Sequence, residues 1–216
     1  MSGSAVFLEK MFLRNVITLS VYHCKNNKAF DIKFASLVTF DKKEMSIQAT
    51  EYPAYFETYI KLVDSDTKLK DELRDSFAED IVFLQSIPED KKDYAYADGK
   101  WTIGEVFQHV VDVELVMSHR AFRISRLDQT NLPGFDHVAY AAVADVSKKS
   151  LADLIKELMQ VRDVTKIHFD KLDEETLSKR GLISGNTMSI RALGYIIIGH
   201  LKHHIKILKE SYLDNA

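Results

Sequence analysis

Cysteine is nearly absent from this chain of 216 residues, since Cys24 is the only one. A single cysteine excludes an intramolecular disulfide, a cysteine-rich metal site and a redox pair of thiols. A chain of this kind suits a reducing compartment.

The sequence also lacks an excess of positive charge and a long apolar run. Its formal net charge is -3 and its pI is about 6.2, with basic and acidic residues interspersed, so nucleic acid is not an expected partner. No apolar run reaches the roughly 18 residues that cross a bilayer. The stretch 16–21 is too short and too polar for the apolar region of a signal peptide. We therefore expect a cytoplasmic protein with no membrane partner.

The first 44 residues differ in composition from the rest. They carry seven basic and four acidic residues, a net charge of +3, together with β-branched and aromatic stretches. A regular helical pattern begins only after Met45. We interpret residues 1–44 as an N-terminal extension, either a start-site artefact or a poorly ordered arm, with a short β appendage as the alternative. Residues 45–216 contain enough apolar material for one globular domain.

From residue 51 onward, apolar residues recur at helical spacing, with little of the alternation typical of strands. The first helical stretches cover residues 55–63 and 69–84, as one long helix or as two pieces. Thr102 and Glu105 then have the spacing of a capping box, in which each side chain satisfies a free amide at the start of a helix. This pattern predicts a helix that continues to about Leu127.

The second half of the chain predicts two further helices. Ser150 and Asp153 repeat the capping-box spacing, and an apolar pattern follows them to residue 169. Ser189 is expected to cap a final helix that runs through Tyr212. Residues 131–135 and 181–186 are interpreted as loops. Four main helices without a strand pattern between them predict an all-α fold, a four-helix bundle.

A histidine pair lies on the interior side of the last predicted helix. At 100° per residue, His204 falls in the middle of the apolar stripe and His200 on its flank. Residues four apart on a helix are neighbours, so both imidazoles can reach one ion at ~2.0–2.1 Å. Such pairs also arise by chance, and His203, on the same side as His200, could serve as a ligand instead.

A third histidine strengthens this interpretation. His109 lies at the edge of the apolar stripe of the helix that Thr102 begins, so an inward ring there could complete a triangle of ligands. Three neutral imidazoles leave a divalent ion with an open position, as in catalytic rather than structural zinc sites. Arg120 points in nearly the same direction and could bind an anionic group of a substrate. An ion pair between Arg120 and an acid on the next helix is the alternative.

Other polar candidates have weaker claims. His119 points away from the stripe that holds His109, so we expect it in solvent, and His23, His137 and His168 lack a supporting pattern. Asp112 could orient the ring of His109 as a hydrogen-bond acceptor, but its helical angle favours solvent.

Three stretches of the sequence resemble a known family. Residues 94–106 read YAYADGKWTIGEV and run on to His109, residues 132–135 read LPGF, and residues 199–204 read GHLKHH. Together they resemble the DinB/YfiT-like superfamily of metal-binding four-helix proteins, over roughly residues 45–213. The resemblance implies that His109, His200 and His204 bind the metal and that His203 does not. It also implies a homodimer and one divalent ion, which is zinc, nickel, manganese or iron.

The resemblance is less specific for the reaction. It favours a thiol-dependent S-transferase, in which the ion activates a low-molecular-weight thiol cosubstrate toward a small-molecule substrate. One alternative is a metal-dependent hydrolase, although Leu201 stands where HExxH metalloproteases carry their glutamate. Another is a non-catalytic, metal-stabilised module of a stress response.

Overall fold

The computed structural model describes residues 47–64 and 67–213. These residues belong to one compact unit, residues 40–216. The predicted N-terminal extension, residues 1–44, lies outside the described residues, as does His23. Within the described part of the chain, no helix has both the length and the apolar composition needed to span a lipid bilayer.

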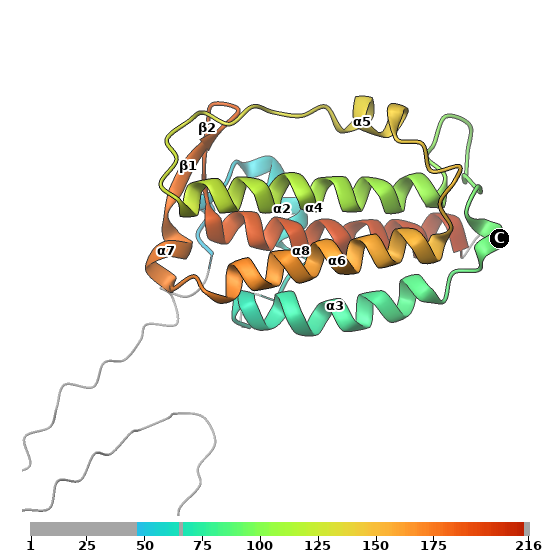
Figure 1. Cartoon of the computed structure of the whole chain (residues 1–216), viewed down its shortest axis with the longest axis horizontal. Helices are drawn as coiled ribbons and strands as arrows, with labels where there is room; N and C mark the ends of the chain where they lie inside the picture. The colour runs from blue at the N-terminus through green and yellow to red at the C-terminus, as the bar shows by residue number, and fades with distance from the viewer. Residues whose placement is uncertain (1–46, 65–66, 214–216) are drawn as a thin grey trace, which may run out of the picture. The chain divides into compact units, whose positions relative to one another are not determined.

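Four long helices form the body of the fold. They are α3 (Leu69–Gln85), α4 (Ile103–Ser125), α6 (Leu151–Asp170) and α8 (Ile190–Ile207). Helix α4 packs against α8 and α6, and α3 packs against the same two helices, so the four close into a ring. Figure 1 shows them running side by side. The predicted all-α four-helix bundle is therefore confirmed.

The starts of three long helices follow from local sequence signals. The Thr102 side chain accepts a hydrogen bond from the amide of Glu105, whose carboxylate accepts from the Thr102 amide in return. Ser150 makes the same reciprocal contact before α6, and the Ser189 side chain accepts from the Ala192 amide before α8. These contacts satisfy amides that a helix cannot pair internally. Helix α4 ends at Ser125, close to the predicted end at Leu127.

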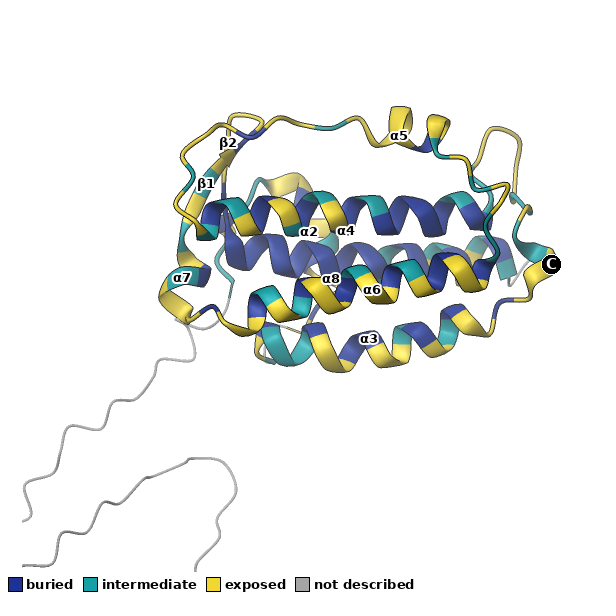
Figure 2. Cartoon of the chain, in the orientation of Figure 1, coloured by how far each residue is buried: buried dark blue, intermediate teal, exposed yellow. Residues whose placement is uncertain are grey.

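Helix α8 is the most deeply embedded helix. It contacts α3, α4 and the short helix α2 (Glu57–Ile60), and Figure 2 shows it buried along most of its length. Most of its apolar side chains are buried, and those of Leu193, Ile196 and Ile198 have no exposed surface. A helix that is apolar on nearly all sides belongs in the centre of a fold. Helix α8 therefore holds its own side chains in fixed directions, including those of His200 and His204.

A buried ion pair joins α4 to α6. The Arg162 guanidinium donates from Nε and Nη2 to the two carboxylate oxygens of Glu114, at 2.7 and 2.9 Å, and stacks over the ring of Phe77. Arg162 is fully buried. Breaking a buried pair of this kind leaves an uncompensated charge and costs about 3–5 kcal/mol. The pair thus fixes how α6 lies against the helix that carries His109.

The first helical stretch is two separate pieces. The 3-10 turns η1 (Ala49–Glu51) and η2 (Ala54–Phe56) lead into α2, whereas α3 begins only at Leu69. The final helix continues past α8 as the π-helical segment η4 (Leu208–Leu213), close to the predicted end at Tyr212. Short elements that the sequence patterns did not predict are η3 (Glu89–Lys91), α5 (His137–Val143) and α7 (Glu174–Ser178).

The prediction of a loop over residues 181–186 is wrong. Strands β1 (Arg180–Ile183) and β2 (Asn186–Ser189) form an antiparallel hairpin with Gly181 opposite Met188. The turn is made by Ser184 and Gly185, both of which have positive φ angles, as a two-residue hairpin turn requires. Each strand has only four residues, too few to show an alternating pattern in the sequence.

Candidate metal centre

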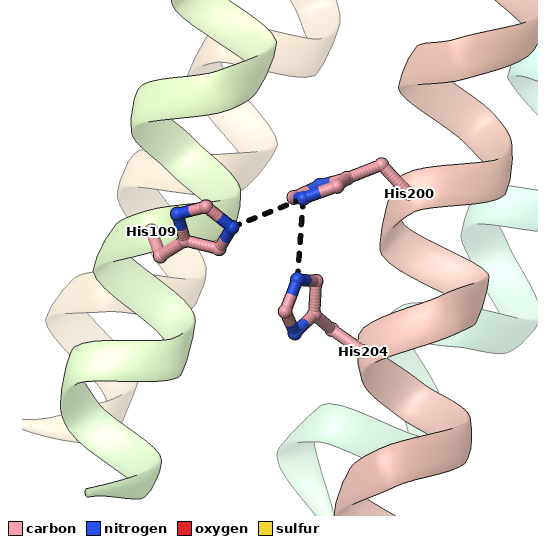
Figure 3. A group of neighbouring side chains, drawn as sticks. All are labelled: His109, His200 and His204. Carbon is pink, nitrogen blue, oxygen red and sulfur yellow. Dashed lines mark hydrogen bonds between the residues drawn. The ribbon is translucent and has the colours of Figure 1, made fainter. Parts of the chain in front are cut away.

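Helices α4 and α8 bring three histidines together. His109 lies in the second turn of α4, while His200 and His204 lie about one turn apart on α8. All three side chains are buried, with exposed fractions of 6%, 5% and 9%. Figure 3 shows the three rings turned toward one another across the space between the two helices. Residues 91 positions apart in the chain thus meet at one point.

The ring nitrogens are close enough to share one ion. Nε2 of His200 lies 3.0 Å from Nε2 of His109 and 3.2 Å from Nε2 of His204. In a tetrahedral site with bonds of ~2.0–2.1 Å, two ligand nitrogens are about 3.3 Å apart. The three side chains can therefore hold one metal ion through their Nε2 atoms. Within the described residues, no fourth histidine, cysteine or carboxylate joins this group.

Burial keeps the three imidazoles neutral. Loss of solvent lowers the pKa of His109 to about 4 and that of His204 to about 3, and it lowers the pKa of His200 well below its usual value. The neighbouring histidines add a smaller effect in the same direction. A neutral imidazole offers a lone pair to a metal, whereas a protonated ring cannot bind one. At pH 7 all three rings are therefore in the form that a metal ion requires.

One ring nitrogen lacks the partner that a ligating histidine usually has. Nδ1 of His204 is buried and has no hydrogen-bond partner among the described residues. Asp112 does not orient His109; its carboxylate accepts instead from Nε2 of Gln108, at 2.9 Å. Packing therefore contributes much of the ring orientation, for example the indole of Trp101, whose centroid lies 4.7 Å from that of His109.

A cavity of about 420 Å³ lies beside the three rings. Aromatic and apolar side chains form most of its wall, namely Tyr55, Phe56, Tyr59, Trp101, Val113, Met117, Phe135 and Ile196. His137 and His203 complete the wall, and no carboxylate lines it. An ion at the three nitrogens would thus face a space in which a small molecule can reach it.

Of the other residues that the sequence analysis considered, His203 lines this cavity, whereas Arg120 and His119 do not. His203 lines the wall, with its ring 5.2 Å from that of Tyr59. Arg120 is buried but does not line the cavity; Nη2 donates to the carbonyl oxygen of Pro133 at 2.8 Å, and the guanidinium stacks on Phe135. His119 is exposed, and it lines a separate groove with His168.

The sequence patterns missed most of the cavity wall. His137 begins the exposed helix α5, and its ring lies 5.7 Å from that of His109. His137 lies two residues after the LPGF loop, but nothing in a helical pattern indicates that this loop crosses the site. Tyr55, Phe56 and Tyr59 fit a helical face, yet their spacing alone does not indicate what they pack against.

Fold and site together define a four-helix-bundle protein with a three-histidine centre open to a cavity. A family model described as the DinB superfamily matches residues 72–208, which include all three histidines, and the chain belongs to this superfamily. YfiT from Bacillus subtilis, described as a probable metal-dependent hydrolase with an unusual four-helix bundle topology, is similar in structure. The TM-score is 0.56 and the identity 14%, over 76% of this chain and 89% of that chain, so the likeness shows the fold. No curated protein matches the chain.

We predict that substituting His109, His200 or His204 by alanine lowers Zn²⁺ affinity more than 100-fold. Loss of a ligand should exceed the roughly 10–100-fold effect of losing a group that only orients a ligand. His203→Ala, on the same helix and beside the same cavity, is the control and should leave the affinity within about threefold, because its ring is not needed for a three-nitrogen site. Competition with a chelator measures each affinity. A loss in His203→Ala equal to that in the other variants would contradict the assignment.

Proposed function

We propose that this protein is a metal-dependent transferase that joins a small thiol to an electrophilic substrate. His109, His200 and His204 would hold one divalent ion. Availability decides whether that ion is zinc, nickel, manganese or iron, since imidazole suits several of them. As a Lewis acid, such an ion lowers the pKa of a thiol that reaches it and so favours the nucleophilic thiolate at neutral pH.

The observation that carries the proposal is the composition of the cavity wall. Its side chains are mostly aromatic and apolar, and no carboxylate lines it to act as a general base. Attack by a thiolate needs neither a base nor a protein nucleophile once the proton has left. The sulfur forms a bond to the electrophilic carbon, the leaving group departs with the bonding electrons, and the thiol proton passes to solvent. Three neutral ligands also leave the positive charge of the ion for an anionic partner.

Hydrolysis is the second candidate function. His137 and His203 line the cavity without belonging to the group of three nitrogens, so either ring could accept a proton from an attacking water. The likeness in fold to YfiT is consistent with this alternative. A purely structural metal site is less well supported, because no fourth side chain among the described residues closes the group.

A thiol-transfer assay separates the two enzymatic functions. Metal-loaded protein should conjugate glutathione or cysteine to 1-chloro-2,4-dinitrobenzene at least tenfold faster than the metal-free protein, a difference of about 1.4 kcal/mol in the barrier. His200→Ala serves as a second control. If loaded protein instead cleaves 4-nitrophenyl acetate without any thiol and does not accelerate conjugation, hydrolysis replaces transfer as the function.

Arg120 is the candidate for binding an anionic group of the thiol or its partner. Its side chain is buried, and no carboxylate pairs with it among the described residues; burial lowers its pKa. The Arg120 guanidinium contacts Met117 and Phe135, which both line the cavity. An anionic group of a bound molecule that extends past the Phe135 ring would therefore contact Arg120.

We predict that Arg120→Met raises the KM for glutathione about tenfold, since a hydrogen bond to a charged group contributes ~1.5–3 kcal/mol. The KM for 2-mercaptoethanol, which has no carboxylate, should change less than about twofold. Steady-state kinetics with both thiols measures the difference. Equal increases for the two would instead mean that Arg120 acts only by holding the loop at Pro133.

A further inference from the structure

One wall of the cavity comes from a segment that precedes the bundle. This pre-bundle segment, residues 47–60, consists of η1, η2 and α2 and lies upstream of residues 72–208, the part that the family model matches. It contributes Tyr55, Phe56 and Tyr59 to the cavity. The Tyr59 ring lies 5.3 Å from that of His200. The position of the segment therefore decides whether the cavity is closed on this side.

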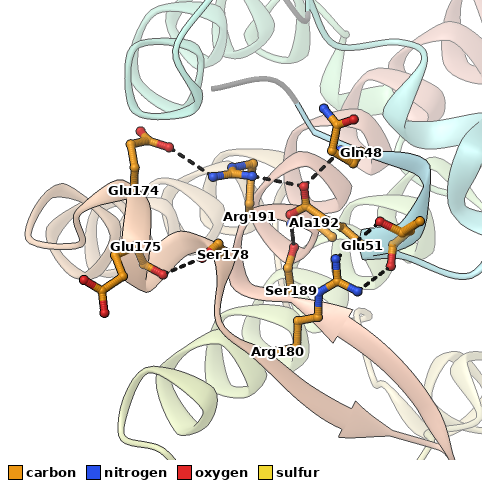
Figure 4. A network of polar contacts seen from close by, with 10 residues as sticks. Gln48, Glu51, Glu174, Glu175, Ser178, Arg180, Ser189, Arg191 and Ala192 are labelled. Carbon is orange, nitrogen blue, oxygen red and sulfur yellow. Dashed lines mark hydrogen bonds and ion pairs between the residues drawn. The ribbon is translucent and has the colours of Figure 1, made fainter. Parts of the chain in front are cut away.

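A buried carboxylate fixes the start of the segment to α8. Glu51, with 3% of its surface exposed, accepts a hydrogen bond from Ser189 Oγ at 2.6 Å and one from Arg191 Nη1 at 3.0 Å. It also accepts from the Gln48 amide at 2.9 Å, which holds its own turn together. Figure 4 shows the Glu51 carboxylate between Gln48 of the segment and Ser189 and Arg191 at the start of the helix. Ser189 and Arg191 are themselves buried, so neither is free to bind solvent instead.

Two further contacts hold the segment in place. Arg180 of β1 donates from Nη1 to the carbonyl oxygen of Thr50 at 2.9 Å. At the other end, Gly199 allows the Tyr59 carbonyl to approach α8, because a Cβ at this position would collide with that oxygen. Gly199 immediately precedes His200. The segment is thus attached at the beginning of α8 and again beside the metal centre.

Charge makes Glu51 the strongest of these attachments. Arg191 has a second acidic partner, Glu174, whose carboxylate lies 3.2 Å from Nη2, but Glu174 is half exposed and belongs to α7. Exposed ion pairs contribute little to stability, whereas loss of one partner of a buried pair is costly. Glu51 and Glu174 therefore offer a matched comparison: both bind Arg191, and only Glu51 ties the segment to it.

We propose that Glu51 is a positioning residue for the candidate metal centre. Its carboxylate docks the pre-bundle segment on α8, so that Tyr55, Phe56 and Tyr59 close the cavity around an apolar or aromatic part of the substrate. The inference rests on the proposed function in taking this cavity as the substrate site. In this proposal, the pre-bundle segment recognises the part of the substrate that does not react. This segment lies outside the part of the chain that the family model matches.

Trp101 provides a direct readout, because it is the only tryptophan of the chain and lines the same cavity. We predict that Glu51→Ala raises the acrylamide quenching constant of Trp101 at least about twofold, since opening the segment lets solvent reach the indole. Glu174→Ala should leave it unchanged. Circular dichroism of each full-length variant at 20 °C reports whether the bundle is intact.

Either of two results overturns the proposal: an intact Glu51→Ala protein with unchanged quenching, or an equal rise in Glu174→Ala. If Glu51→Ala does not fold, the quenching constants of Glu51→Gln and Glu174→Gln are compared instead, because glutamine removes the charge and keeps the volume of the side chain. In the thiol-transfer assay, Glu51→Ala should raise the KM for an aromatic electrophile by a larger factor than it lowers kcat. If no turnover is found in any variant, the proposed function fails, while the quenching result still decides the role of Glu51.

Discussion

The convergence of three imidazole nitrogens between α4 and α8 is the constraint on which the rest of this structure depends. Three Nε2 atoms from almost fully buried rings meet at one point, and that of His200 lies 3.0 and 3.2 Å from the other two. Each Nε2 of a neutral ring either donates or accepts, so not every pair among the three can form a hydrogen bond. Protonated rings would repel one another. A cation at their centre would satisfy all three nitrogens.

The buried position of this centre has two consequences. It keeps the imidazoles unprotonated, so their lone pairs are available. It also means that aromatic and apolar side chains, rather than charged ones, surround the open side of the group. Electrostatic attraction between an ion and an anionic ligand is stronger in such surroundings than in water. The bundle supplies the three histidines and part of the cavity wall, while the loop at Pro133, helix α5 and the pre-bundle segment supply further parts of the wall.

The features that could be predicted from the sequence are those that depend on residues close to one another in the chain. The capping boxes at Thr102 and Ser150 are local, and so is the helical angle that directs His200 and His204 to the same side. The positions of His137 and Tyr59 in the wall depend on how a loop and a short segment lie across the bundle, which no periodic pattern encodes. The hairpin at residues 180–189 was missed because its strands are too short to show a period of two.

Arg120 and Glu51 show the same limit for buried charges. The helical angle of Arg120 was correct for an inward side chain, but its hydrogen bond to Pro133 depends on the path of a loop. In the sequence, Glu51 has no feature that distinguishes it from an exposed acid ahead of a helix. Its carboxylate is nevertheless bound to Ser189 and Arg191, which are 138 and 140 residues away. Partners at such separations become visible only when the fold is known.

X-ray absorption spectroscopy of the zinc-loaded protein tests the central claim most directly. The account predicts three imidazole nitrogens at ~2.0–2.1 Å and a fourth, lighter-atom ligand that is replaced by sulfur at ~2.3 Å when a thiol is added. A first shell of oxygen atoms with no imidazole scattering would contradict it.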